Sequence, residues 1–413
     1  MNIRRCAAAL AAVAVIGIPG SPAFAASPSP SGKPALPDGL YGSTDPKYDG
    51  VWRQSLALLA QHTAGVRPAA RAVDWLTGQQ CADGSYAAFR ADPARACDAK
   101  VMVDTNSTAA AVQALAALGG HDAATGKAVA WLKSVQNKDG GWGYTAGGPS
   151  DTNSTAVVVG ALAAVGEKPA AVVKDGKSPY DALLGLALPC SGDGAGAFAY
   201  QPDKKGELVA NADATAAGVV AALGQGLAAT GAGADGTAAK CAGSGKPTAR
   251  QAAANGAAYL AHQVAEDGYL TSVLPGATAQ PDYGNTADTV VALAAQGGAA
   301  QAKKPLEWLE RHAEAWAKQS GPAAYAQLVF AAHATGTDPR DFGGLDLVKA
   351  LDATGPAPEA TDAPTAGDGA AKPAKSDGGD HTAVWWAGGV FLVVVIAVGF
   401  MLSRRGGKRG QQP

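Results

Sequence analysis

The sequence predicts an all-α protein assembled from a repeated helical unit. The phrase Asp-Thr-Asn-Ser-Thr occurs at residues 104–108 and again at 151–155, each time in front of a run rich in alanine, valine and leucine. Looser versions of the phrase begin at Asn211 and Asn285. The unit recurs roughly every 45 to 75 residues, and self-similarity on this scale is typical of stacked helical architectures.

Twelve segments have the composition of helices, and convincing strands are absent from the sequence. Alanine dominates these segments, and it is the residue that favours helix most while leaving room for close helix contact. The predicted helices cover residues 51–63, 68–80, 105–119, 124–137, 152–166, 179–189, 211–225, 249–263, 285–297, 303–319, 322–335 and 343–352.

The N-terminus has the composition of a secretory signal peptide, predicted over residues 1–25. A pair of arginines is followed by an apolar run and by a small-residue site that ends at Ala25. Residues 26–46 are rich in proline, serine and glycine, and we expect them to be loose.

The C-terminus is predicted to anchor the protein in a membrane. Residues 354–383 have no apolar face to bury and are expected to form a disordered stalk. Residues 384–402 carry no charge, and at about 1.5 Å per residue they are long enough to span a bilayer. The basic tail at 403–413 predicts a cytoplasmic C-terminus. We therefore expect a single-pass cell-membrane protein whose helical region, residues 47–353, lies outside the cell.

The charge balance narrows the classes of partner. The chain has 33 basic and 35 acidic residues, but six of the basic ones lie in the signal peptide and behind the predicted span. The exported part therefore has 27 basic against 35 acidic residues, a formal charge of −8. This balance argues against nucleic acid and anionic lipid as partners.

Four cysteines remain after removal of the signal peptide, at Cys81, Cys97, Cys190 and Cys241. An even number in an oxidising compartment predicts two disulfides. Pairing Cys81 with Cys97 and Cys190 with Cys241 would fasten two of the long loops between helices. A thiolate metal site is the alternative, but no Cys-x-x-Cys or Cys/His spacing supports it.

A second phrase ends alternate helices and carries a family resemblance. The pattern aromatic-Leu-x3-Gln-x3-Gly-x-aromatic occurs at 75–86 and 131–142, with a degenerate copy at 259–269. The glutamine can bond the loop backbone, the glycine permits a tight turn, and the aromatic residue closes over it. The phrase resembles the repeat of the terpenoid cyclase and protein prenyltransferase superfamily.

The resemblance implies a fold and leaves the activity open. It implies an (α/α)6 toroid of six inner and six outer helices over residues 47–353. The helices that open with Asp-Thr-Asn-Ser-Thr are apolar on nearly all sides, as expected of surrounded inner helices, and the helix at 51–63 would close the ring. The acidic phrases and zinc ligands of the superfamily's familiar enzymes are missing, as are HExxH, GxSxG and a phosphate loop. We therefore predict no catalytic residues and no metal.

Polar residues at the starts of the inner helices would gather at one mouth of such a toroid, because these helices all run in the same direction. Aromatic residues of the preceding loops would line its rim. A mouth of this composition is typical of a ligand pocket. The candidate ligand-binding residues are Asp104, Thr105, Asn106, Asp151, Thr152, Asn153, Asn211, Asp213, Asn285, Thr286 and Asp288, with Tyr86, Trp142, Tyr144, Phe198, Tyr200, Tyr269 and Tyr283 at the rim.

Each of these residues also has a purely structural interpretation. Asp, Asn, Ser and Thr at a helix start are its usual caps, each worth about 1 kcal/mol. The aromatic residues, Trp142 and Tyr86 above all, are needed to close the repeat loop. The phrase supplies five polar residues in a row, more than one cap requires, and this surplus favours a binding role for the mouth as a whole.

Within the superfamily, the chain is similar to the cobalamin carriers transcobalamin and intrinsic factor. The likeness rests on export, disulfides and inner helices that open with Asp-Thr phrases. It implies a corrinoid as a possible ligand. Those carriers hold the corrinoid between the toroid and a small β domain, whereas this chain continues into a stalk and an anchor. Another chain, such as a membrane transporter, would have to complete the site.

Three hypotheses follow, from different classes of protein. The first is an anchored extracellular binding protein that captures a corrinoid-like or other small ligand. The second is an exported enzyme acting on lipid-linked or polysaccharide substrates, with Asp104 and Asp151 as an acid/base pair. The third is an envelope protein-interaction module, which would be favoured if the mouth held no cavity of a few hundred Å³.

Overall fold

The computed structural model describes residues 36–233, 240–243, 245–272 and 279–360. All twelve predicted helices are found there, in the predicted order. They are α1 (Gly50–Thr63), α2 (Ala70–Gly78), α3 (Thr105–Leu118), α4 (Asp122–Ser134), α5 (Thr152–Ala164), α6 (Pro179–Gly185), α7 (Ala212–Ala222), α8 (Ala249–Gln263), α9 (Tyr283–Ala295), α10 (Ala299–Ser320), α11 (Pro322–Thr335) and α12 (Leu347–Asp352).

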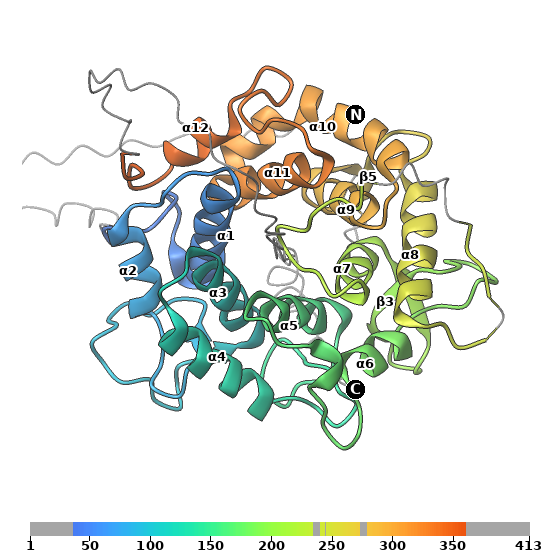
Figure 1. Cartoon of the computed structure of the whole chain (residues 1–413), viewed down its shortest axis with the longest axis horizontal. Helices are drawn as coiled ribbons and strands as arrows, with labels where there is room; N and C mark the ends of the chain where they lie inside the picture. Colours follow the sequence, from blue (N-terminus) through green and yellow to red (C-terminus); the bar gives the residue numbers. More distant parts are fainter. Residues whose placement is uncertain (1–35, 234–239, 244, 273–278, 361–413) are drawn as a thin grey trace, which may run out of the picture. The chain divides into compact units, whose positions relative to one another are not determined.

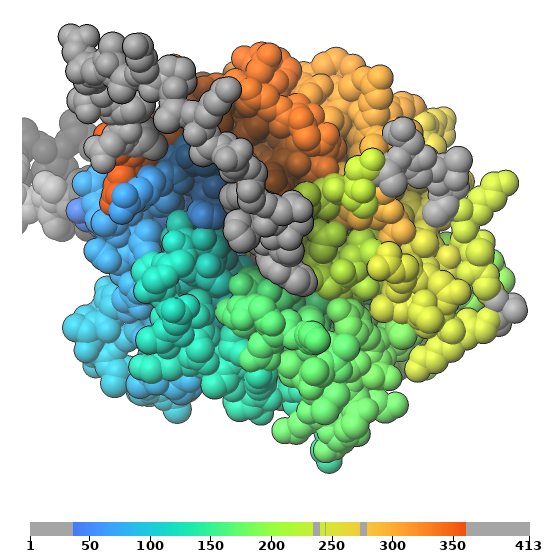
Figure 2. Space-filling model, in the orientation of Figure 1, coloured from blue at the N-terminus to red at the C-terminus, as the bar shows by residue number. Residues whose placement is uncertain are grey.

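The odd-numbered helices form a closed inner ring (Figure 1). α1 contacts α3, and the contacts continue through α5, α7 and α9 to α11, which returns to α1. The even-numbered helices lie outside, where α4 packs on α3 and α5, and α10 packs on α9 and α11. Figure 2 shows the same order on the surface, with the first and last described segments next to each other. Six inner and six outer helices therefore form an α/α ring.

Burial explains the two helix classes. In α5, every residue from Thr152 to Leu162 is buried, because neighbours surround the helix on all sides. In α10, by contrast, the buried residues recur every three or four positions, as in Leu306, Leu309 and Ala313, which gives one apolar stripe against the ring. Small residues on the inner helices allow the close approach that a ring of six requires.

The glutamine-glycine phrase fastens each repeat to the next. Gln136 donates from Nε2 to the carbonyl of Gly140 at 2.8 Å and to that of Val172 at 3.3 Å. Gly140 has a φ of +92°, and a Cβ there would lie 2.2 Å from the carbonyl oxygen of Ser178. Only glycine fits this contact with the start of α6. Gln80 repeats the pattern by donating to Gly84 and to Ala124 of α4.

Three short antiparallel hairpins correct the expectation that strands are absent. They are β1–β2 (Tyr86–Ala87 with Val103–Asp104), β3–β4 (Phe198–Pro202 with Leu208–Asn211) and β5–β6 (Leu270–Ser272 with Gln280–Asp282). Each hairpin leads into an inner helix, namely α3, α7 or α9. Strands of two to five residues carry too few residues to show a period-two pattern, so the sequence did not reveal them.

Both predicted disulfides are confirmed. Cys81 is bonded to Cys97 and Cys190 to Cys241, with Cα atoms 5.6 and 5.4 Å apart. The first closes the loop between α2 and α3, and the second ties the segment after α6 to the one before α8. Both fasten connections outside the inner ring.

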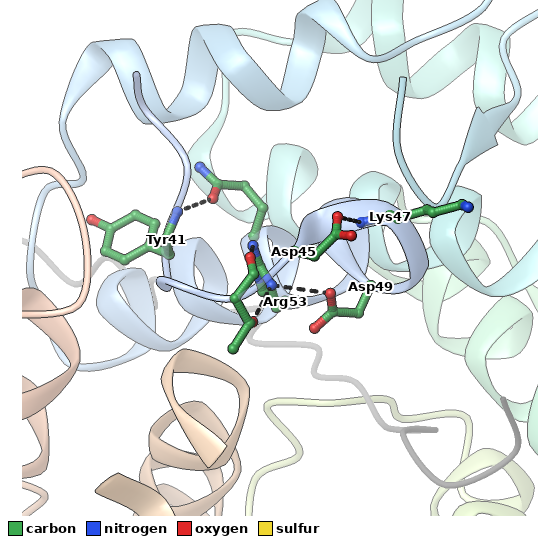
Figure 3. Close-up of polar contacts among 7 residues, drawn as sticks. Tyr41, Asp45, Lys47, Asp49 and Arg53 are labelled. Atoms are coloured by element: carbon green, nitrogen blue, oxygen red, sulfur yellow. Dashed lines mark hydrogen bonds and ion pairs between the residues drawn. The ribbon is translucent and has the colours of Figure 1, made fainter. Parts of the chain in front are cut away.

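Residues 26–46 were expected to be loose, but the part of this segment that the structure describes, from residue 36, packs against the ring. Tyr41 is fully buried; its N–H donates to Gln54 Oε1 at 2.8 Å and its hydroxyl to the carbonyl of Pro356 at 3.0 Å. Arg53 on α1 donates to Asp49 at 3.1 Å and to Thr44 at 2.8 Å (Figure 3). Through these bonds, the segment before α1 is held both to α1 and to the segment after α12.

Within the described part of the chain, no helix is long and apolar enough to cross a membrane. The predicted span at 384–402, the signal peptide at 1–25, the basic tail and the stalk beyond residue 360 all lie outside the described residues.

Candidate functional site

Four inner helices begin with the same side-chain cap. At each, the side-chain oxygen accepts a hydrogen bond from the backbone N–H three residues further on, at 2.6 Å for Asp104, 2.6 Å for Asp151, 2.8 Å for Asn211 and 3.1 Å for Asp282. α1 and α11 have no such cap. Capping therefore accounts in part for the candidates Asp104, Asp151 and Asn211. The N-terminal ends of α3, α5, α7 and α9 lie at the same end of the ring, which we call its polar end.

The cap of α9 is Asp282, which the sequence analysis missed. The signal was a constant spacing of four residues between the cap and a threonine, as in Asp151 to Thr155 and Asp282 to Thr286. Asn285 instead supplies the backbone N–H that the Asp282 cap accepts, and its side-chain amide donates to Asp282 Oδ2 at 2.8 Å.

A buried threonine four residues after each cap holds the preceding loop in place. Its Oγ1 accepts a hydrogen bond from a backbone N–H of the loop or hairpin that precedes the helix, at 2.9 to 3.0 Å in all four repeats. The pairs are Thr108 with Tyr86, Thr155 with Trp142, Thr215 with Phe198 and Thr286 with Leu270. These threonines, including the candidate Thr286, fix the repeat itself.

In three of these four helices, the position two residues after the cap carries a polar side chain that capping does not use. It is occupied by Asn106 in α3, Asn153 in α5 and Asp213 in α7, and by Gly284 in α9. Asn153 donates from Nδ2 to Asp213 Oδ2 at 2.9 Å, which joins α5 to α7. The bond also shows that the N-terminal ends of these two helices lie side by side.

Asp288 is a further polar residue of this end of the ring, one helical turn after Gly284 in α9. It is 1% exposed, and Gln327 of α11 donates to its carboxylate at 3.4 Å. Gln327 also lies against Gly284. The row therefore crosses four inner helices, from Asn153 through Asp213 and Asp288 to Gln327. We call these four residues the inner polar row. Gln327 lies inside an apolar helix without a repeated phrase, so no sequence pattern pointed to it.

Four carboxyl groups at this end of the ring have a raised pKa, namely those of Asp104, Asp151, Asp213 and Asp288. Burial raises the pKa of Asp104 and of Asp151 to about 6, against the lowering effect of the Ser107 and Ser154 hydrogen bonds. Burial raises the pKa of Asp213 to about 7, and the charges of Asp282 and Asp151 add to it. Burial and the charge of Asp213 raise the pKa of Asp288 well above its usual range. Near neutral pH Asp104, Asp151 and Asp213 can therefore hold or release protons.

Several buried polar atoms at this end have no hydrogen-bond partner among the protein atoms. They are Oδ2 of Asp104, Oγ1 of Thr105, both amide atoms of Asn106 and Oδ1 of Asn153. All belong to the first turns of α3 and α5 or to the caps before them, and their residues are 0 to 3% exposed. Thr152, the counterpart of Thr105, differs, because it donates to the carbonyl of Ala199 at 2.6 Å. Buried groups of this kind normally find a partner.

The candidate rim aromatics fall into two groups. Tyr86, Trp142 and Phe198 are 0 to 1% exposed and lie in the core, where the loop-closing role accounts for them. Tyr144 and Tyr200 lie beside the caps: besides burial, the charge of Asp104 raises the pKa of Tyr144, and the charges of Asp151 and Asp213 raise that of Tyr200.

The remaining rim candidates belong to an aromatic stack between α9 and α10. Trp308 lies between Tyr269 and Tyr283, with ring centroids 4.6 and 4.9 Å away, and Tyr283 also stacks on Trp316 at 5.5 Å. These rings cover one another, so packing explains much of their arrangement.

Two cavities of the described region lie away from the candidate residues. One of about 640 Å³ lies between α10 and the turn at Gly343 and Gly344, and is lined by Glu307, Glu310 and Glu314. The other, of about 290 Å³, lies at the C-terminal ends of α1 and α11. In the same region, no group of three or more His, Cys, Asp or Glu side chains is arranged to hold a metal ion.

Comparison with known proteins gives structural likenesses alone. No family model and no curated protein matches the chain. An ent-copalyl diphosphate synthase from Streptomyces platensis is similar at 19% identity and a TM-score of 0.45, over 70% of this chain and 50% of that one. A protein from Actinoplanes has 17% identity and a TM-score of 0.47, over 73% and 94% of the two chains. A sugar epimerase from a ruminal bacterium has 14% identity and a TM-score of 0.44, over 67% of this chain and 80% of that one.

These likenesses do not extend to activity. The chain spans about half the length of the first of these proteins. With TM-scores of 0.44 to 0.47, none carries an argument about this chain, and the α/α ring stands on its own helix contacts. The resemblance to the cobalamin carriers has no support in these comparisons and stays a prediction.

Proposed function

We propose that this chain is a membrane-anchored extracellular binding protein whose ring captures a small ligand at the N-terminal end of its inner helices. The observation that carries the proposal is the group of unpartnered polar atoms on Asp104, Thr105, Asn106 and Asn153. A buried polar group without a hydrogen bond costs about 1–3 kcal/mol. Several of them within two adjacent repeats form a surface that a hydrogen-bonding ligand would satisfy.

A corrinoid is the first candidate ligand. Its peripheral amide arms both donate and accept hydrogen bonds, and the site offers both kinds of group. Acceptors outnumber donors there, because Asp104 Oδ2, Asn106 Oδ1 and Asn153 Oδ1 are unpartnered against Asn106 Nδ2 and the Thr105 hydroxyl. A ligand rich in N–H or O–H groups therefore fits best. A membrane transporter is the proposed recipient of the ligand.

The test is a calorimetric titration of the full-length chain with hydroxocobalamin. We expect saturable binding at micromolar or lower concentration, weakened at least tenfold in Asn106→Ala and in Asn153→Ala. Gln251→Ala is the control, because this amide caps the outer helix α8 and is exposed. Binding that both asparagine variants leave unchanged would refute a site at this end of the ring.

A protein-interaction module is the second candidate. The observation in its favour is that the two described cavities lie at α10 and at the opposite end of the ring. It predicts that the Asn106 and Asn153 variants bind small molecules no differently from the wild type, while an envelope protein is captured by the intact chain and released by charge reversal at Glu310 and Glu314.

A further inference from the structure

Two carboxylates of the polar end do no capping. Asn211 caps α7 and Asp282 caps α9, so neither Asp213 nor Asp288 is needed to begin its helix. Asp213 lies two residues beyond its cap and Asp288 six beyond its own. A stabilising role at the helix start therefore does not account for either carboxylate.

In the part of the chain that the structure describes, no ion pair balances these two carboxylates. Five ion pairs occur among the described residues, and none includes Asp104, Asp151, Asp213 or Asp288. The neighbours of Asp213 add negative charge, since Asp151 and Asp282 both act on it. Burying carboxylates together without a counter-charge is unfavourable unless protons or a cationic ligand neutralise them.

A buried amide next to the carboxylates also lacks a partner. Asn153 is 0% exposed, and its Nδ2 is fixed on Asp213 Oδ2 at 2.9 Å. Its Oδ1 accepts no hydrogen bond. This free oxygen belongs to the same amide group as the nitrogen that is held at Asp213. The amide oxygen and the carboxylate are both hydrogen-bond acceptors, so each can receive a bond from an N–H-bearing ligand.

The spacing of the carboxylates favours an organic cation over a metal ion. No three acidic side chains of the described region come together closely enough to share a metal. Yet the carboxylates of Asp213 and Asp288 lie close enough that the charge of one raises the pKa of the other. An organic cation can reach separated acceptors with several N–H or N–CH₃ groups.

Resting on the proposed function, we infer that the ligand of this end of the ring is a small organic cation, a protonated amine or quaternary ammonium, held by Asp213 and Asp288 together with Asn153. The cation supplies the counter-charge that the inner polar row lacks. Gln327 of α11 holds the Asp288 carboxylate by donating to both of its oxygens.

The test uses pairs of probes that differ in charge. The full-length chain is titrated by calorimetry at pH 8 with choline and with its uncharged isostere 3,3-dimethylbutan-1-ol, and with spermidine and its triacetyl derivative. We expect at least one cation to bind at least tenfold more tightly than its uncharged partner. Asp213→Asn and Asp288→Asn should each weaken that binding at least tenfold. Asp74→Asn, an equal loss of charge on the exposed face of α2, should leave it unchanged.

The outcomes separate this inference from the proposed function. One outcome is that neither cation binds better than its uncharged partner, while hydroxocobalamin binds and Asn106→Ala weakens that binding. The inference of a cationic ligand is then overturned, and the proposed binding function stands. If neither the cations nor hydroxocobalamin bind, both fall. The comparison within each probe pair needs the wild-type chain alone, so a variant that fails to fold does not leave the inference undecided.

Discussion

Replacing Asp213 by asparagine should stabilise the protein at high pH and leave it unchanged at low pH. Asparagine has the same shape, and its carbonyl can still accept the bond from Asn153 Nδ2. It therefore resembles the protonated form of Asp213 at every pH. The pKa of Asp213 is higher in the folded state than in the unfolded state. The contribution of Asp213 to the free energy of unfolding is therefore highest below pH 4, where Asp213 is protonated in the folded protein, and it falls as the pH rises through about 7.

The size of the effect follows from the raised pKa. A pKa moved from 3.8 to about 7 corresponds to about 4 kcal/mol, at about 1.4 kcal/mol per pH unit. Asp213 keeps partial contact with solvent, which reduces the cost of burying its charge, the largest cause of the shift, and also weakens the repulsion from Asp282 and Asp151. We therefore expect Asp213→Asn to raise the free energy of unfolding by about 2 kcal/mol at pH 8 and by less than about 0.5 kcal/mol at pH 4.

The assay is urea unfolding of the full-length chain, followed by circular dichroism at pH 4, 6 and 8. Asp74→Asn is the matched control, because Asp74 is exposed on the outer helix α2 and should show no such dependence on pH. An Asp213→Asn protein that is destabilised equally at pH 4 and pH 8 would show that the carboxylate makes a favourable interaction in the folded state. The argument for an uncompensated charge would then be wrong.

Three further substitutions test the repeat and the site. Thr155→Val removes the hydroxyl oxygen that accepts a hydrogen bond from the backbone N–H of Trp142 at 3.0 Å, and leaves this N–H without a partner. It should lower the free energy of unfolding in urea by about 1–3 kcal/mol. Thr63→Val loses only a hydrogen bond to its own helix and should lower it by less. Gly140→Ala should destabilise the fold by at least about 2 kcal/mol more than Gly147→Ala, since both have positive φ but only the first Cβ meets backbone. Asn106→Leu should raise the melting temperature of the ligand-free protein while abolishing ligand binding, and a lower melting temperature would mean that the Asn106 amide has a partner in the fold.

The repeated phrases by themselves determined the helices and how repeats are joined. Alanine-rich runs with polar starts give helices wherever they occur, because propensity and capping act within a few residues. The same locality made the glutamine-glycine turns predictable, as Gln136 and Gly140 show. The pairing of Cys81 with Cys97 was predictable because the two lie in one loop.

Only the tertiary structure decided which polar residues are surplus. Asp151 and Asp213 look alike in the sequence, yet one caps its helix and the other faces a neighbouring helix, because the ring places α5 beside α7. The meeting of Asp288 with Gln327 joins helices that no shared phrase connects. Local sequence fixes whether a side chain can cap, since the partner is three residues away. Whether a buried polar group finds a partner depends on what the closed ring brings to it from elsewhere in the chain.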